Sequence, residues 1–103
     1  MLIVRSANGV PTRLTDERSQ HIVRRHPEMD GHRNLVLETL TDPDYVQEGD
    51  FGALLAVRLF PGAVLAGKYV VVVYRETDPM DGFVLTAYLA RRPSDRRGTI
   101  WRR

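Results

Sequence analysis

The sequence lacks cysteine, has no long apolar run and contains a single lysine. Without cysteine, disulfides, thiolate nucleophiles and thiolate metal ligands are excluded. No apolar run approaches the roughly 20 residues that a membrane helix needs. The remaining composition, 43% hydrophobic and 27% charged over 103 residues, is typical of one globular domain spanning residues 1–103. We therefore expect a cytoplasmic protein that does not enter a membrane.

Charge is unevenly distributed along the chain, although the net charge is only +2. Residues 1–52 hold six Arg against nine acidic residues, whereas residues 53–103 hold eight Arg and one Lys against four. Residues 91–103 alone contain six Arg and one Asp. A basic half attracts a polyanion, and the planar fork of arginine suits phosphate. RNA is the partner that we favour. The alternative is that abundant arginine reflects a GC-rich genome or a thermophilic habit.

Two helices are predicted in the first half of the chain. Thr15 has the character of an N-cap followed by acidic residues, which favour a helix N-terminus. This helix should run to about His26, because Pro27 disfavours helical geometry in the residue before it. A second helix is predicted over residues 31–41, and the Asp-Pro-Asp sequence at 42–44 ends it.

The second half of the chain has the pattern of consecutive strands joined by short links. A short edge strand is also predicted at residues 2–4, before the turn at Asn8 and Gly9. The fold class is therefore α+β, with two N-terminal helices packed on a four- to five-stranded antiparallel β-meander. The strands of this meander are expected at residues 45–47, 53–60, 68–76, 83–89 and, as the fifth, 99–101.

Polar side chains on the last two long strands are candidates for a functional surface. Strict alternation places Thr86 and Tyr88 on one face together with Val84. If that face points away from the helices, the pair forms a patch with either Arg75 or Lys68, because the sequence does not determine the register. The alternative is structural, since Thr and Tyr are also common on half-exposed strands.

The first predicted helix carries two histidines, the natural proton-transfer residues near neutral pH. His21 shares a positive stripe with Arg18, Arg24 and Arg25. His26 is expected to lean toward the core at the helix end. Their separation of five residues places the two imidazoles roughly 140° apart around the helix, so they do not form a metal-binding pair. The structural alternatives are an exposed His21 and a buried, capping His26.

Four short motifs together resemble a family. They are Thr15-Asp-Glu-Arg, His21-Ile-x-Arg-Arg-His-Pro-Glu, Lys68-Tyr-Val-Val-Val-Val-Tyr-Arg-Glu and Gly82-Phe-Val-Leu-Thr-Ala-Tyr. Over about residues 14–92 the chain is similar to a small bacterial and phage-associated nuclease-like group. That group belongs to the fold shared by barnase, EndoU, colicin tRNases and RelE-type toxins.

The resemblance implies RNA cleavage without a metal or cofactor, and a cognate antitoxin or immunity protein as a further partner. The catalytic positions it implies are His21 or His26, Arg75 or Lys68, and Thr86 with Tyr88. The chain departs from several relatives in having no histidine on any predicted strand. The residues expected to contact nucleic acid are Arg24, Arg25, Lys68, Arg91 and Arg92.

Two other functions remain open. The first is a non-catalytic nucleic-acid-binding module that uses the arginine-rich tail, with Arg91, Arg92, Arg96 and Arg97 as its contacts. The second is a homodimeric interaction protein, in which Tyr88, Trp101 and exposed strand edges form the interface.

Overall fold

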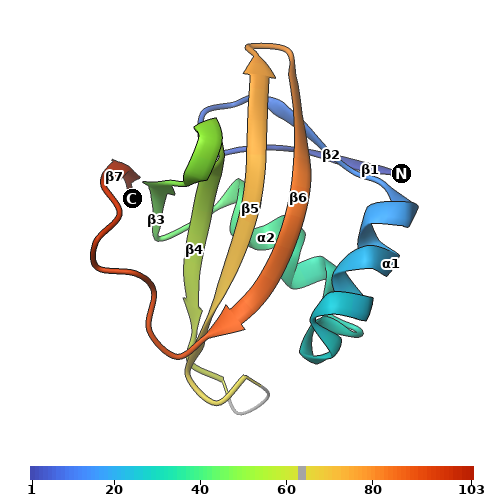
Figure 1. Cartoon of the computed structure of the whole chain (residues 1–103), viewed down its shortest axis with the longest axis vertical. Coiled ribbons are helices and arrows are strands. Elements are labelled where there is room, and N and C mark those ends of the chain that lie inside the picture. Colours follow the sequence, from blue (N-terminus) through green and yellow to red (C-terminus); the bar gives the residue numbers. More distant parts are fainter. Residues whose placement is uncertain (63–64) are drawn as a thin grey trace.

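The computed structural model describes residues 1–62 and 65–103 and confirms the α+β class (Figure 1). Its helices are α1 (Asp16–Arg25) and α2 (Arg33–Thr41), and two short 3-10 turns are η1 (Pro27–Met29) and η2 (Asp50–Gly52). Its strands are β1 (Leu2–Arg5), β2 (Pro11–Leu14), β3 (Tyr45–Glu48), β4 (Leu54–Phe60), β5 (Lys68–Asp78), β6 (Asp81–Ala90) and β7 (Thr99–Arg102). None of the helices in these ranges has the length and apolar character needed to cross a membrane.

All seven strands form one mixed sheet in the order β1-β2-β6-β5-β4-β3-β7. The antiparallel meander from β3 to β6 follows the sequence pattern, and β7 joins it beside β3. The prediction of four or five antiparallel strands is wrong, because the β1–β2 hairpin extends the sheet and β2 runs parallel to β6. This contact pairs Thr12 with Gly82, where an added Cβ would lie 2.9 Å from the Arg75 carbonyl oxygen.

The ends of α1 follow the local chemistry of the sequence. Thr15 caps the helix, and its Oγ1 accepts a hydrogen bond from the Arg18 amide at 3.1 Å. The helix ends at Arg25, before the cap residue His26 and Pro27. Helix α2 begins at Arg33, two residues later than expected, because Gly31 adopts a left-handed φ of 77° that interrupts helical geometry.

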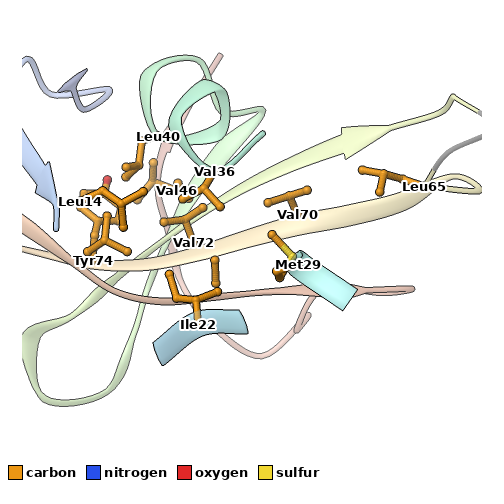
Figure 2. Close-up of a cluster of buried hydrophobic side chains, with 13 residues drawn as sticks. Leu14, Ile22, Met29, Val36, Leu40, Val46, Leu65, Val70, Val72 and Tyr74 are labelled. Atoms are coloured by element: carbon orange, nitrogen blue, oxygen red, sulfur yellow. The ribbon is translucent and has the colours of Figure 1, made fainter. Parts of the chain in front are cut away.

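The main core lies between one face of the sheet and the helices (Figure 2). Ile22 is the buried residue of α1, and Val36 and Leu40 of α2 pack beside it. Helix α2 covers β5, β4 and β1, whereas α1 lies along β6. In Figure 1 the strands are seen from the opposite face, with α2 behind them. None of the helices in the described ranges covers that opposite face.

Candidate functional site

Three half-buried tyrosines lie on the sheet face without helices, and we call this surface the tyrosine face. It is defined by Tyr45 on β3, Tyr69 on β5 and Tyr88 on β6. The rings pack on a second apolar cluster of Leu55, Val57 and Val71. The tyrosines thus shield the middle of the sheet and remain partly exposed to solvent.

The strand register places three of the predicted residues together on the tyrosine face. Tyr88 lies opposite Val71, and Thr86 lies opposite Val73. Arg75 is two residues beyond Val73 on the same strand and therefore shares its face. The alternative patch with Lys68 is wrong. Lys68 pairs with Phe60 at the far end of β5 and shares the helix-covered face with Val70 and Val72.

A β-bulge in β6 sets which side chains reach the tyrosine face. Val73 pairs with Thr86, but the next residue, Tyr74, pairs with Val84, so Leu85 is an extra residue. A bulge re-aims the strand that carries it. Val84 consequently turns into the main core, where it is 3% exposed. The expectation that Val84 shares a face with Thr86 and Tyr88 was wrong, since it assumed unbroken alternation.

Helix α1 borders the tyrosine face along the outer edge of β6. Strand β2 pairs with β6 at Gly82 and Phe83 only, so the rest of this edge of β6 lacks a strand partner among the described residues. Arg18 of α1 fills part of the gap, because its Nη1 donates to the Leu85 carbonyl at 3.3 Å. The edge is thus bordered by a helix whose Arg18, His21 and Arg25 share one flank.

His26 brings an imidazole directly to Tyr88. The two ring centroids are 5.6 Å apart, with an angle of 37° between the ring planes. The His26 side chain is 34% exposed, and its Nδ1 lies 3.7 Å from a Glu28 carboxylate oxygen. The expectation of a His26 that leans into the core is therefore wrong. As the cap residue, His26 has a non-helical φ of −134°, and its ring lies against the sheet instead.

His21 lies in a basic environment on the exposed flank of α1. Partial desolvation, followed by the positive charges of Arg18 and Arg25, lowers the pKa of His21 below its ordinary value. These surroundings favour the neutral form of its imidazole. The described ring contact with Tyr88 belongs to His26, so the geometry distinguishes the two histidines that the sequence left equivalent.

The other predicted basic residues do not gather at one point. Arg25 lies on the α1 flank, whereas Arg24 lines a groove between α1 and α2 on the other side of the helix. Arg91 and Arg92 are exposed in the bend that follows β6. Arg97, farther along the tail, returns to β3 and forms an ion pair with Asp50 at 3.1 Å.

Tyr45 and Tyr69 are members of the face that the sequence did not single out. Burial, then the neighbouring Tyr69, raises the pKa of Tyr45 above its ordinary value. The Arg102 guanidinium lies 5.6 Å from the centre of the Tyr45 ring, within the range of a cation–π contact. Alternation along β5 places Tyr69 on the face of Arg75, but only the pairing of β3 with β4 and β7, and of β4 with β5, brings Tyr45 and Arg102 to that face.

The homodimer hypothesis relied on Tyr88 and Trp101 forming one interface. Tyr88 belongs to the tyrosine face, whereas Trp101 packs against the main core on the helix-covered side.

Across residues 1–62 and 65–103, no three His, Asp or Glu side chains form a group that could hold a metal ion. No protein family, curated protein or solved structure matches this chain significantly. Function is therefore inferred from the site itself.

Proposed function

We propose that the protein is a metal-independent endoribonuclease that binds RNA on the tyrosine face. The observation that supports this most directly is the His26 imidazole packed 5.6 Å from the ring of Tyr88. An imidazole and a phenol at that separation can act as a proton acceptor and a proton donor on either side of a phosphodiester. Both rings are partly exposed, so RNA can reach them.

The reaction that fits this pair is internal transesterification of RNA. His26 takes the proton of a ribose 2′-hydroxyl, and the 2′-oxygen attacks the adjacent phosphorus. The bond from phosphorus to the 5′-oxygen breaks, and Tyr88 donates its proton to that oxygen. The products are a 2′,3′-cyclic phosphate and a 5′-hydroxyl. Proton transfer from the His26 imidazolium back to the Tyr88 phenolate restores the starting state.

One hydroxyl group and several arginines on neighbouring elements are candidates for contacts to the phosphate. Thr86 lies two residues from Tyr88 on the same face, about 7 Å along the strand, and can donate to a non-bridging phosphate oxygen. Arg18 and Arg25 on the α1 flank can stabilise the charge that develops on the phosphorane. Arg75 extends the basic surface toward the next nucleotide. A cognate antitoxin or immunity protein stays a prediction of the family resemblance.

Cleavage of total tRNA and ribosomal RNA in EDTA tests the proposal. Both His26→Ala and Tyr88→Phe should lower the rate about 10²- to 10⁴-fold, the range for loss of one acid or base. His32→Ala is the matched control, because His32 occupies the N-cap position of α2, away from the tyrosine face, and its side chain makes no capping hydrogen bond, so the rate should be unchanged. Thermal melting followed by circular dichroism would show that each variant is folded.

Two outcomes would overturn the catalytic proposal. One is intact RNA at high protein concentration, and the other is full activity of folded His26→Ala. In either case the non-catalytic binding module becomes the better explanation. It would be recognised by RNA affinity that falls steeply as salt rises and that weakens when Arg91 and Arg92 are neutralised.

A further inference from the structure

Phe51 is the most exposed large apolar side chain among the described residues, with 94% of its surface accessible. It lies in the tight turn η2 (Asp50–Gly52) between β3 and β4. Its backbone has φ 54° and ψ 40°, the left-handed region that bulky residues rarely adopt. The ring therefore contributes little to the core, and its backbone conformation is strained.

The turn has the geometry of a type I′ hairpin turn. The Ala53 amide donates to the Asp50 carbonyl at 3.0 Å, and both central residues have left-handed φ values, 54° at Phe51 and 80° at Gly52. Asn-Gly is the sequence that this turn favours, because Asn tolerates the left-handed region at the first position. Gly52 suits its position, whereas Phe51 occupies the position where Asn is expected.

Contacts around the turn hold Phe51 at the Arg75 end of the tyrosine face. Arg75 donates from Nη1 to the Phe51 carbonyl oxygen, and Arg97 pairs with the neighbouring Asp50. Gly49 allows the chain to close tightly, since a Cβ there would lie 2.6 Å from Leu55 Cδ1. An exposed aromatic ring is thus presented on a fixed turn beside two guanidinium groups.

We propose that Phe51 stacks on an unpaired base of an RNA strand bound across the tyrosine face, so that the substrate is single-stranded RNA. The inference rests on the proposed function for the location of the strand. A flat ring beside guanidinium groups matches a nucleotide, which offers an aromatic base and an anionic phosphate. Bases within a duplex are already stacked on both sides and have no free face for Phe51. The three tyrosines provide further aromatic surface along the same path.

Fluorescence anisotropy with a short labelled 2′-O-methyl oligonucleotide tests the proposal, because this strand cannot be cleaved through its 2′-oxygen. Stacking of one base on an aromatic ring is worth about 1–3 kcal/mol, so Phe51→Leu should weaken binding roughly 5- to 150-fold. Phe51→Tyr should bind as the wild type does. Ile3→Ala removes another exposed apolar side chain, on β1, and should change nothing.

Phe51→Gly separates the ring's role in binding from any role in folding. Glycine relieves the left-handed strain, so this variant should melt at a higher temperature than the wild type while binding RNA as weakly as Phe51→Leu. Wild-type affinity in both Phe51→Leu and Phe51→Gly would overturn the inference. So would duplex RNA that binds as tightly as the single strand.

The result also separates this inference from the catalytic proposal. Binding that depends on Phe51, without cleavage of natural RNA, would support the stacking role and refute the nuclease. Cleavage of natural RNA by Phe51→Leu at the wild-type rate would support the nuclease and refute the stacking role. No binding of any RNA by the wild type would overturn both. Equal binding of single-stranded DNA would overturn the choice of RNA, and binding of a protein alone would overturn the nucleic-acid assignment.

Discussion

Replacing Tyr74 with phenylalanine should stabilise this protein. Tyr74 lies on β5 in the main core with no exposed surface (Figure 2). None of the described residues offers its hydroxyl a hydrogen-bond partner. Burial, with a smaller contribution from Glu76, raises the pKa of this phenol well above its ordinary value of 10.0. Phenylalanine keeps the ring and its packing and removes only the isolated hydroxyl.

The expected size of the effect follows from the cost of burying an unpaired polar group, about 1–3 kcal/mol. Tyr74→Phe should therefore increase the free energy of unfolding by about 1 kcal/mol or more. For a domain of roughly 100 residues, each kcal/mol corresponds to a rise of about 4–8 °C in Tm. The change is opposite in sign to that of most core substitutions, which destabilise.

Alkaline pH provides a second measurement with a defined sign. The pKa of Tyr74 is higher in the folded state than in the unfolded state. The free energy of unfolding therefore keeps its full value below the ordinary pKa of 10.0 and falls as pH rises above it, because the unfolded chain loses the phenol proton first. Tyr74→Phe should lose less stability than the wild type between pH 7 and about pH 10.5. Tyr45, whose pKa is also raised, remains in both proteins and should leave some residual loss.

Urea denaturation followed by circular dichroism at both pH values measures these changes. Lower stability of Tyr74→Phe at pH 7 would refute the reasoning, because it would show that the hydroxyl holds a hydrogen bond, for example to a buried water molecule. If the wild type and Tyr74→Phe lost the same free energy of unfolding at alkaline pH, the pKa of Tyr74 would be the same in the folded and unfolded states.

Two further predictions concern the sheet and α1. Gly82→Ala should destabilise the protein by about 1–3 kcal/mol in urea, because its Cβ would meet the Arg75 carbonyl oxygen at 2.9 Å, whereas Gly62→Ala, with open space around it, should not. Proton NMR should show His21 titrating below its ordinary value of 6.5, and Arg18→Gln should raise that midpoint. Because the unfolded chain binds the His21 proton more readily, His21 should lower stability as pH falls below 6.5. An unchanged His21 midpoint in Arg18→Gln would show that the Arg18 charge has no such effect.

Local chemistry was sufficient to predict the helix ends and most of the strands. Thr15 provides an N-cap hydrogen bond within its own helix, and Pro27 constrains its immediate neighbour, so both signals act over a few residues. Strand β2 escaped prediction because it is only four residues long and its place in the sheet depends on the pairing of Thr12 and Arg13 with β6, about 70 positions later. Its Pro11 is tolerated at the first residue of a strand.

The candidate site depended more strongly on contacts between distant segments. The alternation of β6 was read without its bulge, and one extra residue at Leu85 was enough to turn Val84 into the core. The choice between Arg75 and Lys68 required the register of β5, and the importance of His26 required the packing of α1 on the edge of β6. Phe51 was not recognised because its exposure and left-handed φ are properties of the folded hairpin.

The amino-acid sequence by itself determined that there is no thiol chemistry, that arginine provides nearly all the positive charge, and where α1 begins and ends. These properties depend on composition or on bonds between residues close along the chain. Tertiary structure alone decided that the face of Thr86 and Tyr88 on β6 is also the face of Arg75 and Tyr69 on β5 and of Tyr45 on β3, and that His26 borders it. The physical reason is that a strand has two faces, and a one-residue shift in its pairing with a distant segment exchanges them.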